Sequence, residues 1–88
     1  MITFKVHPDG KESYEVTATT RDIVRWEKSG KNRSFAKLME DVQLADMYEL
    51  AYYASQRAKS FNGSLDTFLD TVDLEFETED QDPTRGDR

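Results

Sequence analysis

The fold of this chain is decided near its N-terminus by the stretch Ile2-Thr3-Phe4-Lys5-Val6-His7-Pro8-Asp9-Gly10. The first residues of the stretch alternate apolar and polar side chains, which is the period of a half-buried strand. The stretch ends in Pro8-Asp9-Gly10, a strong turn signal, because proline presets φ, aspartate bonds back to the backbone and glycine accepts a positive φ. We therefore expect the chain to reverse direction here.

A second alternating run follows this turn. It places Tyr14, Val16 and Ala18 on one face and polar side chains on the other. Residues 1–19 thus predict a β-hairpin. Because a lone hairpin is only marginally stable in water, its apolar face must pack on the segments that follow.

Residues 20–29 predict a short helix that Thr20 caps and that a glycine ends. Ile23 and Trp26 lie three residues apart on one face of this helix. Val24 in place of Ile23 is an equally good candidate for the buried side, and the pattern does not choose between them.

A basic polar loop over residues 29–33 leads to a second short helix over residues 35–41. Ser34 is its predicted N-cap, and the helix carries apolar side chains at helical spacing. These are Phe35, Leu38 and Met39.

Residues 43–60 give the clearest helical pattern in the chain, since no glycine or proline interrupts them. Their apolar side chains recur along one stripe, and we expect a long helix that ends at Phe61-Asn62-Gly63. The stripe contains Leu44, Met47, Tyr48, Leu50, Ala51, Ala54, Ser55 and Ala58.

A last helix is predicted after Ser64, its N-cap. Its amphipathic face extends to the final apolar residue and contains Leu65, Phe68, Leu69, Val72 and Phe76. From Glu77 the chain is rich in acids, which predicts a disordered tail over residues 77–88. The sequence as a whole predicts the α+β class, with one domain over residues 1–76 in which an N-terminal β-hairpin packs on three to four α-helices.

The composition narrows the range of functions. The chain has 88 residues, no cysteine and a net charge of −6. The negative charge argues against nucleic-acid binding, which usually needs a basic face. No apolar run is long enough for a membrane span, and the first residues lack a signal-peptide pattern. We therefore expect a cytoplasmic protein that binds other proteins and has no membrane or nucleic-acid partner.

Residues with catalytic potential are scarce. His7 is the only histidine and sits beside the predicted turn, where solvent exposure is the simplest interpretation. The many carboxylates fall on predicted polar faces, without the shielding that a general-acid pair requires. We accordingly expect no catalytic residues, no metal ligands and no cofactor, and a protein that is not an enzyme.

Aromatic residues on the helices are the best candidates for contact with a partner. Tyr48 and Tyr52 are neighbours on one face of the long helix, whereas Tyr53 points about 100° away. Tyrosine and tryptophan are enriched at interface anchors. For Trp26 and Tyr48, packing of the side chain on the hairpin explains the aromatic residue as well as contact with a partner does. The predicted partner-binding set is Trp26, Tyr48, Tyr52, Tyr53 and Arg57.

The order of these segments resembles a known protein family. The hairpin is followed by Arg21-Asp22-Ile23-Val24-Arg25-Trp26-Glu27, then by Leu50-Ala51-Tyr52-Tyr53-Ala54-Ser55-Gln56-Arg57 and by Phe68-Leu69-Asp70-Thr71-Val72 before the acidic end. This layout is similar to that of the short-form tail assembly chaperones of siphophages, especially those that infect actinobacteria.

The resemblance implies a role in virion assembly in the host cytoplasm. Such chaperones bind the tape measure protein and keep it soluble until tail tube subunits polymerise around it. A longer form made by ribosomal frameshifting recruits the tube subunits. The chaperone itself is absent from the finished particle, and self-association into a homo-oligomer is compatible with this role.

Two other functions are consistent with the sequence. One is a structural virion component, either a head–tail connector or a minor tail protein. The other is an acidic nucleic-acid mimic that occupies a host DNA-binding protein, which requires carboxylates arrayed on one face.

Overall fold

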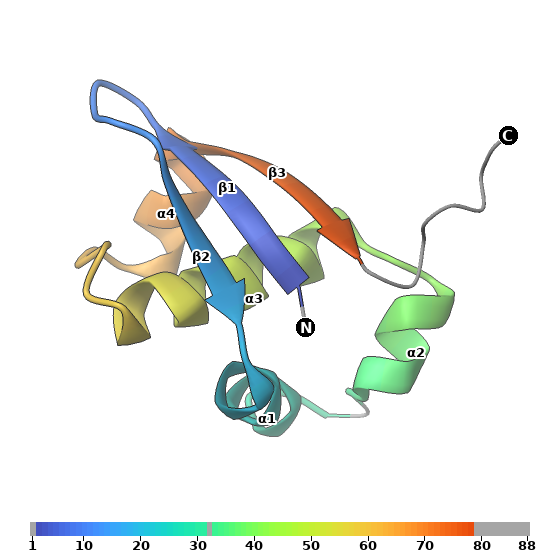
Figure 1. The fold of residues 1–88 in the computed structure, drawn as a ribbon. Helices are drawn as coiled ribbons and strands as arrows, with labels where there is room; N and C mark the ends of the chain where they lie inside the picture. Colours follow the sequence, from blue (N-terminus) through green and yellow to red (C-terminus); the bar gives the residue numbers. More distant parts are fainter. Residues whose placement is uncertain (1, 32, 79–88) are drawn as a thin grey trace, which may run out of the picture.

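The computed structural model describes residues 2–31 and 33–78. Its centre is a three-stranded antiparallel sheet (Figure 1). Strand β1 (Ile2–Pro8) lies in the middle, between β2 (Tyr14–Ala18) and β3 (Val72–Thr78). The first strand of the chain is therefore hydrogen-bonded on both sides.

The predicted N-terminal hairpin is confirmed. β1 pairs with β2 in a register that sets Phe4 opposite Val16 and Ile2 opposite Ala18. Gly10 adopts a φ of 72° in the turn, which explains the glycine at this position. The α+β class and the packing of the hairpin on helices are confirmed as well.

The last predicted helix ends earlier than expected, and the extension of its amphipathic face to Phe76 was wrong. Helix α4 spans Leu65–Thr71, and the chain passes directly into β3. From Val72 onward, apolar and acidic residues alternate strictly, which is the period of a strand. Phe76 lies opposite Phe4 of β1, and the two ring centroids are 5.9 Å apart. Pairing with β1 and burial of this face outweigh the helical spacing.

Three further helices precede α4. Helix α1 spans Thr20–Lys28, α2 spans Phe35–Glu40 and α3 spans Leu44–Arg57. Two of them, α3 and α1, pack on β2. The side chains of Ser34 and Ser64 accept backbone N–H groups at the starts of α2 and α4, as predicted. The expected cap at Thr20 was wrong, because the N-cap of α1 is Thr19.

Helix α3 runs behind the sheet and supplies most of the helical part of the core (Figure 1). The Tyr14 hydroxyl donates to Ser55 Oγ at 3.0 Å, which ties β2 to the buried side of α3. The buried apolar residues of α3 are Met47, Leu50, Ala51 and Ala54.

Several apolar residues lie outside this core. The structure decides between Ile23 and Val24, because Ile23 packs against the core whereas Val24 is 42% exposed. Leu44 and Leu69 were expected on buried faces, but they are 64% and 44% exposed. Burial of Phe68 sets the rotation of α4 and turns Leu69 outward.

Strand β3 extends through Thr78, two residues into the segment predicted as a disordered tail. The rest of that predicted tail, residues 79–88, lies outside the described residues. None of the helices in residues 2–31 and 33–78 is long and apolar enough to cross a membrane.

The neighbouring residues Phe68 and Leu69 test the rotation of α4. We expect Phe68→Ala to lower the free energy of unfolding by about 3–5 kcal/mol, because it empties a fully buried site. Leu69→Ala should change it by less than about 1 kcal/mol, since the side chain is largely exposed. Urea unfolding followed by circular dichroism measures both, and equal losses would contradict this packing.

Candidate partner-binding cleft

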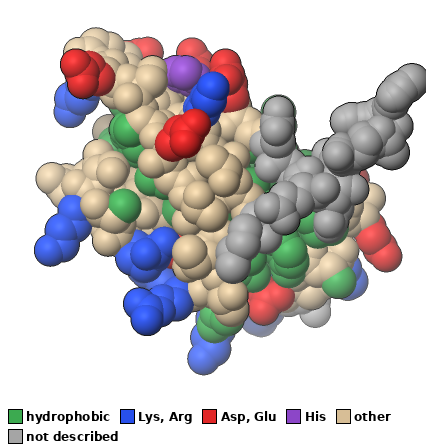
Figure 2. All heavy atoms as spheres, in the orientation of Figure 1, with side chains coloured by type: hydrophobic (Ala, Val, Ile, Leu, Met, Phe, Trp, Pro, Cys, Tyr) green, Lys and Arg blue, Asp and Glu red, His purple; other side chains and the backbone are tan. Residues whose placement is uncertain are grey.

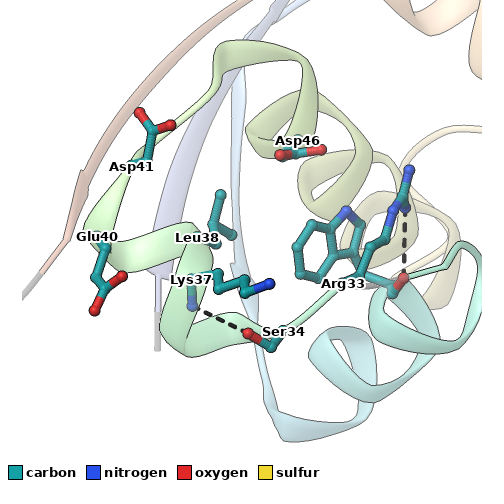
Figure 3. Close-up of a pocket in the computed structure, with 8 residues that line it drawn as sticks. Arg33, Ser34, Lys37, Leu38, Glu40, Asp41 and Asp46 are labelled. Carbon is teal, nitrogen blue, oxygen red and sulfur yellow. Dashed lines mark hydrogen bonds between the residues drawn. The ribbon is translucent and has the colours of Figure 1, made fainter.

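A cleft of about 360 Å³ opens where α1, α2 and the start of α3 meet (Figure 3). We call it the α1–α2–α3 cleft. It is lined by Trp26, Arg33, Ser34, Lys37, Leu38, Glu40, Asp41 and Asp46. Figure 3 shows that these side chains come from separate segments of the chain, so the cleft exists only in the folded protein.

The apolar part of the cleft is formed by Trp26 and Leu38. Trp26 is 2% exposed and Leu38 is 3% exposed, so both also belong to the core. The Trp26 indole N–H has no hydrogen-bond acceptor among the described residues. A buried donor without an acceptor costs about 1–3 kcal/mol, so this N–H offsets part of the stability gained by burying the ring.

Arg33 fixes one wall of the cleft. Its guanidinium carbon lies 5.1 Å from the centroid of the Trp26 ring, a cation–π distance. The same group donates to Glu49 Oε1 on α3 at 2.6 Å and to Ser29 Oγ at 2.8 Å. These contacts hold the loop between α1 and α2 against α3.

The opposite wall is helix α2. Leu38 is the one residue of α2 that is buried, and the Glu27 carboxylate accepts the N–H of Phe35 at 2.8 Å. Ser34 Oγ accepts the N–H of Lys37 at 3.1 Å and so caps the helix, as Figure 3 shows. Helix α2 is thus anchored at its start and by Leu38, and Phe35 and Met39 also pack against the core.

The rim of the cleft carries both signs of charge. Lys37 and Glu40 belong to α2, Asp41 follows it, and Asp46 lies in the first turn of α3. A rim with both signs around an apolar floor suits a protein segment that itself carries apolar and charged side chains.

The structure places only one of the predicted partner-binding residues, Trp26, in this cleft. Tyr48 lies elsewhere, where its hydroxyl donates to the carbonyl oxygen of Val72 at 3.1 Å and its ring meets Phe68 edge-on. Burial raises the pKa of Tyr48, and the charge of Asp73 adds to this effect. Tyr48 therefore joins α3 to the junction of α4 and β3.

Tyr52 and Tyr53 also have contacts within the protein. The Tyr52 hydroxyl donates to the carbonyl oxygen of Gly63 at 3.1 Å, and its ring packs on Phe68 with centroids 5.6 Å apart. Tyr53 lies under Arg25 of α1, whose guanidinium carbon is 4.9 Å from the ring centroid. Both tyrosines are half-buried.

Arg57 forms an ion pair that the sequence analysis missed. Its Nε donates to Asp22 Oδ1 at 3.0 Å and its Nη2 donates to Asp22 Oδ2 at 2.9 Å. Asp22 is fully buried and also accepts the N–H of Thr19 at 2.9 Å. Burial alone would raise the pKa of Asp22, but the hydrogen bonds from Arg57 and Thr19 lower it overall. The acid in the first turn was the available signal, but nothing in the sequence paired it with a residue so distant along the chain.

His7 lies in β1 rather than in an exposed turn. Its Nδ1 is 2.7 Å from Ser13 Oγ, and its Nε2 is 3.5 Å from a carboxylate oxygen of Glu75 on β3. Among the described residues, no group of three or more His, Cys, Asp or Glu side chains could hold a metal ion.

Comparisons with known protein families, with curated proteins and with solved structures found no match to this chain. The assignment of a function therefore rests on the sequence and on the geometry described above.

The Asp22–Arg57 pair gives a prediction about pH. Because the pKa of Asp22 is lowered by folding, its charge stabilises the folded state above the ordinary pKa of 3.8, and this contribution is lost as the pH falls through the lower folded value. Asp22→Asn should therefore lower the free energy of unfolding by about 1–3 kcal/mol at neutral pH. The difference in free energy of unfolding between Asp22→Asn and the unmodified protein should shrink as the pH falls below about 4.

Urea unfolding over a pH series measures this difference. Asp70→Asn, which changes an exposed carboxylate on α4, is the matched control and should alter stability by less than about 0.5 kcal/mol at neutral pH. A difference for Asp22→Asn that grew as the pH fell would show that the carboxylate is not stabilised in the way described.

Proposed function

We propose that this protein is a tail assembly chaperone of a long-tailed bacteriophage, which binds the tape measure protein in the host cytoplasm until tail tube subunits polymerise around it. The observation that carries the proposal is the α1–α2–α3 cleft, with its apolar floor and its rim of both charges. The resemblance of the sequence layout to the short-form chaperones supports it independently. In this proposal a longer, frameshifted form recruits the tube subunits.

The physical task of such a chaperone fits the cleft. A tape measure protein is a long helical rod whose apolar surface is exposed before assembly, and large exposed apolar surfaces lead to aggregation. An amphipathic helix is commonly bound by laying its apolar side chains in a groove. Trp26 and Leu38 would receive such a side chain, and the rim residues would pair with the charges that flank it.

Leu44 extends the apolar surface available to a partner. It is the first residue of α3, lies two residues before Asp46 of the rim, and is 64% exposed. Burial of such a side chain contributes about 1–2 kcal/mol. Many copies, each bound weakly along one rod, would hold the tape measure through multivalency and would be displaced by the better-fitting tube.

The arrangement of charges disfavours the nucleic-acid mimic. On the solvent face of the sheet, Lys5 lies opposite Glu15 on one side and Glu75 on the other. The described carboxylates of this face are thus interrupted by a cation, whereas mimicry of phosphates needs an uninterrupted array. Figure 2 shows acidic and basic side chains interspersed over this face.

Co-expression with the tape measure protein of the same genome tests the proposal. We expect the tape measure to be insoluble alone and soluble with this protein, with which it should co-purify. Leu44→Ser should weaken binding about tenfold, because it removes an exposed apolar side chain from the first turn of α3, which also carries Asp46 of the rim. Leu69→Ser is the matched control, since it changes an exposed leucine on α4, at the other end of the sheet (Figure 1).

Each result has a distinct meaning. If the unmodified protein neither solubilises nor binds the tape measure, the chaperone function is wrong. If it binds but the two leucine variants behave alike, the function stands and Leu44 is not part of the binding surface. Detection of this chain in purified particles would instead favour a structural virion component.

A further inference from the structure

The charges that line the α1–α2–α3 cleft are not balanced. Its charged lining residues are Arg33, Lys37, Glu40, Asp41 and Asp46. The charge of Arg33 is already offset by Glu49 of α3, to which Arg33 donates at 2.6 Å. Of these lining residues, Lys37 is therefore the one cation left to face three carboxylates. The rim of the cleft has an excess of negative charge.

The carboxylates of this rim have no partner of their own. None of the three forms an ion pair with a residue of the described segments 2–31 and 33–78. The carboxylates that hold the helices together differ in this respect, because Asp22 pairs with Arg57 and Glu49 pairs with Arg33. A cation brought to the rim would therefore gain a carboxylate without displacing an existing ion pair.

Two of the rim carboxylates lie where α2 leads into α3. Asp41 is the C-cap of α2, and Asp46 lies in the first turn of α3 and is partly buried. Figure 3 shows both on the same side of Leu38, whereas Lys37 lies on its other side. Leu44, which comes between the two acids in the sequence, is largely exposed. This side of the cleft thus offers apolar surface and negative charge together.

We propose that the cleft selects an amphipathic helix in which a lysine or arginine stands one turn from the apolar side chain that packs over Trp26 and Leu38. We call that side chain the anchor. The inference rests on the proposed function, because it names the chemistry of the segment that the cleft binds. Residues three or four positions apart lie on one side of a helix. The residue one turn from the anchor therefore reaches the rim, where a cation pairs with Asp41 or Asp46 and a carboxylate is repelled.

The rim charge acts on specificity more than on affinity. An exposed ion pair strengthens binding by only about twofold to fivefold. The apolar floor of Trp26 and Leu38 supplies the larger part of the binding energy, but it accepts any apolar side chain of suitable size. Repulsion of segments flanked by acids is what allows the cleft to distinguish one apolar helix from another.

Binding of short tape measure peptides tests the inference. Labelled peptides that together cover the tape measure protein of the same genome are titrated with the full chain, and the anisotropy of the label is followed. We expect the tightest-binding peptide to carry a lysine or arginine one turn from an apolar residue. Replacing that basic residue by glutamine should weaken binding about threefold, and replacing it by glutamate about tenfold.

A double variant of the protein identifies the acidic side of the rim. Asp41→Asn with Asp46→Asn keeps the shape of both side chains and removes their charge. It should weaken binding of the original peptide about fivefold and remove most of the difference between that peptide and its glutamate version. Asp66→Asn with Asp70→Asn is the matched control, because it makes the same change in net charge at exposed carboxylates of α4. Circular dichroism checks that both variants are folded.

Charge reversal and salt give two further readouts. Asp41→Lys with Asp46→Lys should reverse the preference, so that the glutamate peptide binds more tightly than the original. For the unmodified protein, the preference for the basic peptide should largely vanish at about 1 M salt, where the Debye length is about 3 Å, while apolar binding persists.

The outcomes separate this inference from the proposed function. The inference is overturned if the tightest peptide has no such basic residue, or if the original and glutamate peptides bind equally well. It is also overturned if Asp41→Asn with Asp46→Asn behaves like the control. In each of these cases a tape measure peptide is still bound, so the chaperone function stands. If no peptide binds, the inference is wrong, and co-purification of the intact tape measure decides the function separately.

Discussion

The position of α1 depends on one buried carboxylate. Asp22 is fully buried, accepts the N–H of Thr19 at the start of the helix, and receives two hydrogen bonds from Arg57 at the end of α3. A buried charge is tolerated only when such partners replace the lost hydration. Because Trp26 follows Asp22 by one helical turn, the same ion pair that fixes α1 also positions the floor of the cleft.

The fold could be predicted wherever its signals are local. The alternation before Gly10, the turn itself and the serine caps each depend on a few neighbouring residues, and all were confirmed. The third strand was missed because Val72 and Phe76 satisfy a helical spacing as well as a strand period. This segment forms a strand and not a helix because it pairs with the edge of β1 that β2 leaves free.

The candidate site was harder to predict than the fold. Trp26 was a candidate from the sequence and lines the cleft. Its neighbours there come from the loop before α2, from α2 and from α3, and only the folded chain brings them together. The three tyrosines of α3 were candidates for partner contact, with packing on the hairpin an equal alternative for Tyr48. Within the protein they contact Val72, Gly63 and Arg25. Interface and core use the same aromatic residues, so composition alone does not distinguish them.

The central claim is that an apolar helical segment of the tape measure binds in the α1–α2–α3 cleft, and the single tryptophan of the chain reports on it directly. The measurement is a titration of this protein with amphipathic peptides from the tape measure, in which Trp26 fluorescence and the anisotropy of a labelled peptide are followed together. We predict that both signals change with the same midpoint, since the peptide contacts the floor formed by Trp26. A rise in anisotropy without any change in Trp26 emission would contradict the account, because the peptide would then be bound elsewhere.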